Sequence, residues 1–260
     1  MSGEAPLVRL AGVSKAFAQR AGRVPAVAGV DLEIDRGEFV SLIGPSGCGK
    51  STLLRLVGGL LATDGGEVTV GGQRPAAGRR AKQFGFVPQT PALLPWRTVR
   101  RNARLLTEVN RTSDDGELSA AATESLLEEV GLGGFLDAYP RELSGGMQQR
   151  VALVRAFSLG APILLMDEPF AALDEMTRAE MRYLLLGLWE HHGATVLFVT
   201  HSITEAVMLS DRVVVLTPRP ARVAAVEQVT LPRPRHAAQE DSVAFFEHVT
   251  RVRQALQTSR

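Results

Sequence analysis

The feature that most constrains this chain is a nine-residue segment, Gly44–Thr52 (G-P-S-G-C-G-K-S-T), which fits the pattern G-x-x-x-x-G-K-[ST]. The short apolar run Glu38–Ile43 precedes it and predicts a buried strand, and Lys50–Leu60 has apolar residues at helical spacing. This order predicts a phosphate-binding loop, because backbone N–H groups and the positive end of the helix then face one anion. The alternative is a glycine-rich turn with a solvated lysine, which leaves the strand and helix unexplained.

The side chains of this loop suit a nucleoside triphosphate with Mg²⁺. We expect Lys50 to reach the β- and γ-phosphates, the Ser51 hydroxyl to ligate Mg²⁺, and the Thr52 hydroxyl to lie on the α-phosphate side. The backbone of the remaining loop residues should complete the cradle: Gly44, Pro45, Ser46, Gly47, Cys48 and Gly49. Cys48 is the only cysteine, so a disulfide or metal role is not expected. Because it borders the phosphates, its modification is expected to block nucleotide binding.

Length and composition exclude several classes of protein. The chain has 260 residues, of which 45% are hydrophobic and 22% charged, as in a folded domain rather than a disordered chain. Its net charge of +1 provides no field that would attract nucleic acid. The N-terminus lacks a basic-then-apolar signal, and no apolar run approaches the roughly 20 residues of a membrane span. We therefore expect a soluble chain whose membrane role, if any, comes through a partner.

Two adjacent carboxylates follow a second apolar run. Ala161–Met166 predicts a buried strand, and Asp167 and Glu168 come directly after it. Carboxylates at the end of a buried strand are costly unless a ligand requires them. We expect Asp167 to hold Mg²⁺ and Glu168 to act as the general base or to orient the attacking water. Considered alone, the pair also fits an acidic turn closed by Pro169.

Four further residues complete the predicted site. His201 follows the predicted strand Ala194–Thr200, at the edge where open α/β sheets bind ligands, and is expected to contact the γ-phosphate and the water. Gln89 ends the strand that includes Phe86 and Val87, and its side-chain oxygen can ligate Mg²⁺. Asp174 is a good helix N-cap as well as a candidate ligand contact. Phe17 either stacks on the purine ring or staples the first strands to the core.

The remaining segments give a coarse order of elements. Strands are expected over Leu7–Val13, Val30–Ile34, Glu67–Val70 and Arg212–Thr217, and helices over Leu118–Val130, Asp174–His191 and Val243–Leu256. Ser202 and Glu205 form a capping-box pattern that opens a further helix. The segments Arg74–Lys82 and Thr112–Gly116 are expected to be solvated loops. A helical region is predicted over residues 92–158.

Taken in order, these motifs resemble the ATP-binding-cassette (ABC) ATPases. The resemblance rests on Gly44–Thr52, Gln89, the signature L-S-G-G-M-Q-Q-R at Leu143–Arg150, Asp167–Glu168, Leu173–Asp174 and His201, and it spans nearly the whole chain. It implies an α/β P-loop NTPase (RecA-like) core, with an N-terminal antiparallel β subdomain and an inserted α-helical signature subdomain. The core would comprise residues 1–91 and 159–220, the helical subdomain 92–158, and a short extension 221–260.

The resemblance also implies partners. In this family two cassettes pair head to tail, so Ser144, Gly145, Gly146 and Gln148 would face ATP bound by a second cassette, for which an identical copy is the simpler expectation. Ser144 can cap the following helix, and the two glycines would leave its N–H end open to an anion. Membrane-spanning permease subunits would hold the chain at the cytoplasmic face of the membrane, and a solute-binding protein would act indirectly. Nucleic acid is not an expected partner.

A finer resemblance points to one group of importers. Pro91–Val99 (P-A-L-L-P-W-R-T-V) and Met166–Asp174 are similar to the importers of nitrate, alkanesulfonates, taurine and thiamine-pyrimidine precursors. Trp96 is then expected to lie on the surface and contact the permease. The alternative interpretation is that Trp96 is an ordinary aromatic residue of the core. An exporter cassette, and a cassette that acts on DNA or ribosomes, remain as alternatives. Against the last, the chain has one cassette and no coiled-coil run between its motifs.

Overall fold

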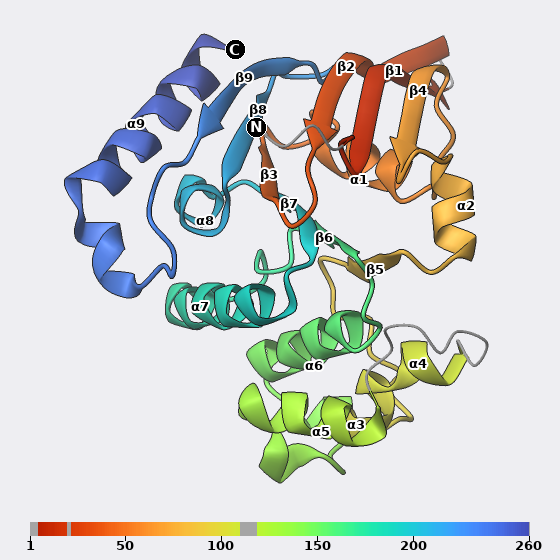
Figure 1. The fold of residues 1–260 in the computed structure, drawn as a ribbon, viewed down its shortest axis with the longest axis vertical. Helices are drawn as coiled ribbons and strands as arrows, with labels where there is room; N and C mark the ends of the chain where they lie inside the picture. The colour runs from red at the N-terminus through yellow and green to blue at the C-terminus, as the bar shows by residue number, and fades with distance from the viewer. Residues whose placement is uncertain (1–4, 20–21, 110–118, 260) are drawn as a thin grey trace.

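Two sheets organise the chain, seen in Figure 1 as separate groups of strands. The computed structural model describes residues 5–19, 22–109 and 119–259. The larger sheet has the order β5-β6-β7-β3-β8-β9. Its strands are β5 (Phe84–Val87), β6 (Ile163–Asp167), β7 (Thr195–Thr200), β3 (Phe39–Ile43), β8 (Arg212–Leu216) and β9 (Val223–Gln228). The first five are parallel and β9 is antiparallel. Every residue of β3, β6 and β7 is buried, as expected for parallel strands covered on both faces.

The smaller sheet is antiparallel, with the order β2-β1-β4. It consists of β1 (Val8–Gln19), β2 (Gly22–Ile34) and β4 (Gly65–Val70). Both β1 and β2 are longer than predicted, since their pairing continues through register shifts in β1. The extension takes Phe17 into β1, opposite Val24. Helix α1 (Lys50–Val57) packs between the two sheets and shares one hydrophobic core with both.

Helices occupy the chain between β5 and β6, as predicted. They are α3 (Val99–Ala103), α4 (Leu105–Val109), α5 (Ala120–Glu129) and α6 (Gly145–Phe157), with short 3₁₀ turns η1 (Gly133–Phe135) and η2 (Pro140–Glu142). Figure 1 shows them grouped at one end of the molecule, away from the smaller sheet. Thr98, Ser119 and Ser144 cap α3, α5 and α6 through their hydroxyls. The predicted polar loop Thr112–Gly116 lies outside the described residues.

The C-terminal third contains α7 (Glu175–His192), α8 (Ile203–Leu209), η3 (Ala237–Asp241) and α9 (Val243–Thr258). Sequence analysis missed β9, which pairs with β8 and lies in a segment rich in proline and arginine, residues 218–235. Arg235 orders this segment, because its buried guanidinium donates to the carbonyls of Val207, Met208 and Ser210 at the end of α8. Burial lowers the pKa of Arg235 to about 10.

Two predicted boundaries were wrong for local reasons. Arg74–Lys82 is not a loop throughout, because Pro75–Arg80 forms helix α2, with proline at its first position. Helix α1 ends at Val57 rather than Leu60, since Gly58 and Gly59 follow and Gly59 has a φ of 63°. Leu60 is left 49% exposed. Among the helices of the described chain, none has the length and apolarity needed to cross a bilayer.

Candidate active site

The predicted site residues converge on the carboxyl edge of the larger sheet. The loop Gly44–Gly49 follows β3, Glu168 follows β6, and His201 follows β7. The parallel registers align these strand ends, since Ile43 lies opposite Thr200 and Asp167 opposite Val199. On the other side of β6, Val87 of β5 pairs with Met166, which brings the turn after β5 to the same edge. Ligands bind at this edge in open α/β sheets.

The glycine-rich loop is tightly curled around its own lysine. Lys50 Nζ is buried and donates to the carbonyls of Gly44 at 2.9 Å and Pro45 at 3.2 Å. Gly47 has a φ of 73° and Gly49 a φ of 129°, values that L side chains rarely adopt. A Cβ on Gly49 would lie 2.6 Å from the Ala26 carbonyl oxygen of β2. The loop therefore requires glycine at Gly49 both for its backbone conformation and for its contact with the smaller sheet.

Ser51 and Asp167 form a pair of oxygen ligands beside the loop. Ser51 Oγ donates to Asp167 Oδ1 at 2.6 Å, which joins the first turn of α1 to the end of β6. The other carboxylate oxygen of Asp167 lies 3.9 Å from a guanidinium nitrogen of Arg55. A hydroxyl and a carboxylate oxygen are donors that Mg²⁺ accepts, and one or two protein ligands suffice where phosphates and water supply the rest. The residues present therefore fit Mg²⁺.

Glu168 lies between Lys50 and His201 in a strained conformation. Its φ is 47°, although it is not glycine, and its N–H donates to the Val199 carbonyl at 2.9 Å. Its Oε1 is 3.9 Å from Lys50 Nζ, and His201 Nδ1 donates to its Oε2 at 3.1 Å. Left-handed backbone in a glutamate costs energy and is found mainly where a functional geometry requires it. The turn thus directs one carboxylate toward both a cation and an imidazole.

Comparison with known proteins identifies the family. Residues 27–171 match the family described as ABC transporter. The chain belongs to the ABC transporter family. It is 43% identical to an uncharacterized ABC transporter ATP-binding protein, MJ0412, of Methanocaldococcus jannaschii. The 244 aligned residues cover 93% of this chain and 88% of the relative.

Other relatives and solved structures agree with this assignment. The aliphatic sulfonates import ATP-binding protein SsuB 1 of Xanthomonas axonopodis pv. citri is 45% identical over 84% of this chain and 85% of its own length. SsuB of Bacillus cereus (strain ATCC 10987 / NRS 248) is 40% identical over 90% of each chain. The dimeric ATP-binding cassette MJ0796 bound to ADP and Pi matches with a TM-score of 0.73 at 32% identity, over 86% of this chain and 100% of that one. The α/β P-loop fold predicted from sequence is confirmed.

The signature segment of this cassette begins helix α6. Ser144 caps the helix by accepting from Met147 N at 3.3 Å, and Gly145 is exposed. Gly146 is buried and packs against α7, since a Cβ there would lie 2.7 Å from Thr177 Cγ2. The ATP contacts expected of Gly146 and Gln148, which involve a second cassette, stay predictions. Within this chain Gln148 is half-buried. Its amide nitrogen donates to the carbonyls of Pro140 and Leu143, holding the segment before the signature.

Three other predicted residues are placed as follows. Asp174 caps α7, accepting from Thr177 N at 3.0 Å, and this hydrogen bond lowers the pKa of its carboxyl. Phe17 is half-buried and packs against the core of the smaller sheet. Lys15 Nζ lies 5.9 Å from its ring centroid. Gln89 is exposed in the turn after β5. Purine stacking by Phe17 and metal ligation by Gln89 stay predictions.

A network of polar contacts next to His201, made by Thr200, Glu205 and Arg178, was missed by sequence analysis. The predicted capping box is half-formed: Ser202 Oγ accepts from Glu205 N, but the Glu205 carboxylate turns to Thr200 Oγ1 at 2.5 Å. Glu205 is 4% exposed, and burial raises the pKa of its carboxyl. Its other oxygen lies 3.7 Å from Nε of Arg178.

Arg178 extends this network of polar contacts to the turn before α7. Its Nη2 donates to the Leu173 carbonyl at 2.7 Å and its Nε to the Phe170 carbonyl at 3.4 Å. Through Arg178 and Glu205, the turn that carries Asp174 is connected to the turn that carries His201. The only sequence signal for this link is a pair of charges in otherwise amphipathic helices.

Burial changes the expectation for Cys48. Its side chain is 1% exposed within the core of the smaller sheet, and burial raises the pKa of the thiol. Because the thiolate is the reactive form, we expect native protein to resist iodoacetamide and unfolded protein to react rapidly. Mass spectrometry of intact protein with and without urea measures the difference. Rapid stoichiometric alkylation of the native chain would contradict this placement of Cys48.

Proposed function

We propose that this cassette hydrolyses ATP to drive solute import through a separate permease. The contacts that join Lys50, Glu168 and His201 support this proposal most directly. Lys50 neutralises β- and γ-phosphate charge, and Glu168 accepts a proton from the attacking water. His201 orients Glu168 through Nδ1 and presents its other ring nitrogen to the γ-phosphate. Ser46, Gly47, Cys48 and Gly49 contribute backbone N–H groups, and Thr52 a hydroxyl.

Ser51, Asp167 and Gln89 are the proposed holders of Mg²⁺. Ser51 and Asp167 are already hydrogen-bonded to each other, and Gln89 follows the strand that pairs with β6. When bound, Mg²⁺ would neutralise charge on the phosphates during transfer. Among the described residues no cluster of three His, Cys, Asp or Glu side chains could hold a metal, which is consistent with an ion held largely by phosphate and water.

Pairing of two cassettes completes the proposed site. Figure 1 shows α6, which begins at the signature, in a different part of the molecule from α1, which follows the phosphate loop. Ser144 and Gly145 therefore need a second copy to meet a bound nucleotide. Dimeric structures of the similar cassette MJ0796 support this arrangement, one of them with ADP and Pi. The capped, exposed start of α6 supplies an anion-binding helix end.

The proposed solute is an aliphatic sulfonate. Relatives that carry the name aliphatic sulfonates import ATP-binding protein are 40–45% identical over more than four-fifths of this chain. Deleting the gene should prevent growth on an alkanesulfonate as sole sulfur source while growth on sulfate persists. The wild-type gene should restore growth, and Glu168→Gln should not. Normal growth of the deletion strain would rule out this solute, and recovery by Glu168→Gln would contradict an ATP-driven role.

The segment after Gln89 forms the proposed contact with the permease. It is rigidly held: buried Asn102 accepts from Leu94 N and donates to the carbonyls of Leu94, Arg97 and Thr98. Trp96 nevertheless is 70% exposed. An exposed tryptophan on an ordered turn is typical of an interface anchor rather than of a core position.

Helix α6 connects this segment to the signature. Arg155, near the end of α6, is buried and donates to the carbonyls of Pro91 at 2.6 Å and Ala92 at 3.0 Å. Burial lowers the pKa of Arg155. Since Ser144 caps the other end of the same helix, a displacement at the signature is passed to the turn that carries Trp96. We propose this helix as the mechanical link between cassette closure and the permease.

Replacing Trp96 with alanine should separate assembly from catalysis. We expect basal ATP turnover of the isolated chain to stay within about twofold, because surface substitutions away from packed features change little. Recovery of the permease with tagged protein from detergent-solubilised membranes should fall at least tenfold, as for an interface anchor worth about 2 kcal/mol. Phe246→Ala, an exposed aromatic on α9, serves as the control. Equal loss of turnover and assembly would instead make Trp96 a structural residue.

A further inference from the structure

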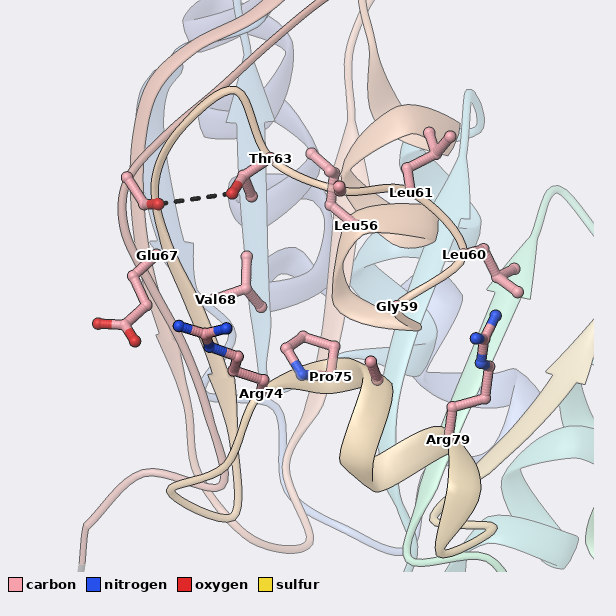
Figure 2. Close-up of a pocket in the computed structure, with 13 residues that line it drawn as sticks. Leu56, Gly59, Leu60, Leu61, Thr63, Glu67, Val68, Arg74, Pro75 and Arg79 are labelled. Carbon is pink, nitrogen blue, oxygen red and sulfur yellow. Dashed lines mark hydrogen bonds between the residues drawn. The ribbon is translucent and has the colours of Figure 1, made fainter.

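A cavity of about 560 Å³ lies at the opposite end of α1 from the phosphate loop, bounded by β4 and α2 (Figure 2). Its floor is apolar, with Leu56 and Val68 buried and Leu61 and Pro75 half-buried. The volume falls in the range of about 300–1,000 Å³ typical of small-molecule sites. The cavity therefore has the size and the apolar lining for an aliphatic chain.

Cationic groups flank this floor. Arg74 and Arg79 line opposite sides of the cavity in Figure 2, and within the described chain neither guanidinium has an ion pair or hydrogen bond to another side chain. Their surroundings differ, however. The Glu67 carboxylate lines the same side as Arg74, where it would repel a bound anion, whereas the guanidinium of Arg79 points toward exposed Leu60. Arg79 is thus the stronger anchor for an anion.

We propose that this cavity binds a small aliphatic monoanion. Its carboxylate or sulfonate headgroup would lie on Arg79, where a guanidinium can make two parallel hydrogen bonds to it. Its chain would lie over Leu60, Leu56 and Pro75. The site is separate from the nucleotide site and does not depend on the transport role proposed above.

The position of the cavity gives its occupancy a route to the phosphate loop. Helix α1 begins with Lys50 and Ser51 and is about 12 Å long, and Leu56 near its far end lines the cavity. Just beyond its end, a Cβ on Gly59 would lie 2.8 Å from the Pro75 carbonyl carbon, so the backbones leading from α1 and into α2 are in contact. A ligand wedged against both would shift α1 along its axis. The bound anion is therefore expected to change the KM for ATP.

Calorimetric titration of the isolated chain with hexanesulfonate tests the site. We expect saturable binding, no comparable binding of hexylammonium, and an affinity that rises from butane- to octanesulfonate by up to about fourfold per methylene. Arg79→Ala should weaken binding at least about tenfold, as for loss of a charge-assisted hydrogen bond. Arg80→Ala is the matched control, because it removes the same charge from the same helix but does not line the cavity.

A second variant tests the cavity without changing any charge. Ala76→Phe, at an exposed position of α2 that lines the cavity, should block binding of every chain length and abolish the sulfonate effect on the KM for ATP. Unchanged thermal unfolding would show that both variants fold. Absence of saturable binding, equal losses in Arg79→Ala and Arg80→Ala, or equal binding of hexylammonium would overturn the proposal. An unchanged KM for ATP in the saturated wild-type protein would overturn its regulatory part. None of these outcomes depends on the permease, so they leave the proposed function untouched.

Discussion

Replacing Glu168 with glutamine should nearly abolish ATP hydrolysis while ATP binding persists. Glutamine keeps the size of the side chain but cannot accept a proton from water, and general-base catalysis contributes roughly 10²–10⁴-fold to rate. It also loses the charge that faces Lys50 Nζ at 3.9 Å and His201 Nδ1 at 3.1 Å. With a neutral side chain beside Lys50, the triphosphate meets less repulsion. The ATP-bound dimer should therefore accumulate.

Two measurements separate these effects. Phosphate release under saturating ATP and Mg²⁺ reports turnover, and size-exclusion chromatography with and without ATP reports the dimer. Glu129→Gln, an exposed carboxylate at the end of α5, should behave as wild type in both. Turnover by Glu168→Gln within tenfold of wild type would remove Glu168 as the base. Loss of ATP binding would instead mean that the carboxylate supports the structure of the loop.

That these candidate residues lie together could be predicted from sequence, because their positions depend on the ends of parallel strands. A glycine-rich loop after one buried strand, two carboxylates after a second and a histidine after a third had to meet wherever those strands are parallel neighbours. The registers of β3, β6 and β7 fulfil this condition. Residues such as Ser51 and Asp167, 116 positions apart in the chain, are thereby brought to 2.6 Å.

What sequence could not predict are contacts made across elements by side chains of ordinary type. Glu205 fits a capping box locally, but Thr200 and Arg178 compete for its carboxylate. Gln148 stands in the signature, yet its amide is used by carbonyls of its own chain. Arg155 lies within an apolar helical run, where only the folded structure reveals the Pro91 and Ala92 carbonyls that compensate its burial. In each case the deciding partner is distant in sequence or is a backbone carbonyl.

The element boundaries missed by sequence have the same origin. Strand β9 exists because β8 offers it an edge, although its own residues follow a proline- and arginine-rich turn. Helix α2 begins at Pro75, and proline is common both in loops and at the first position of a helix. Local pattern leaves such segments undecided, and tertiary pairing determines their structure.

A Gly49→Ala substitution should destabilise the chain and abolish ATP binding together. Gly49 has a φ of 129°, and a Cβ there would lie 2.6 Å from the Ala26 carbonyl oxygen and 3.1 Å from Ala221 Cβ. The same Ala26 oxygen already accepts a hydrogen bond from Ala221 N at 2.9 Å, so it has little freedom to move. Backbone strain and this clash together should cost about 3 kcal/mol or more, which corresponds to a fall in Tm of roughly 5–10 °C.

Gly47→Ala separates the two causes. Gly47 also has a positive φ, 73°, but a Cβ there meets nothing within 4 Å. The Gly47→Ala variant should therefore lose only the cost of left-handed backbone, about 1–2 kcal/mol of its free energy of unfolding, and its Tm without nucleotide should fall less than that of Gly49→Ala. Thermal unfolding without nucleotide and titration with a fluorescent ATP analogue measure stability and binding for both variants. Equal falls in Tm would show that backbone conformation alone dictates glycine in this loop. A larger fall for Gly49→Ala would show that glycine there is also required by the contact between the phosphate loop and β2, which fixes the loop to the smaller sheet.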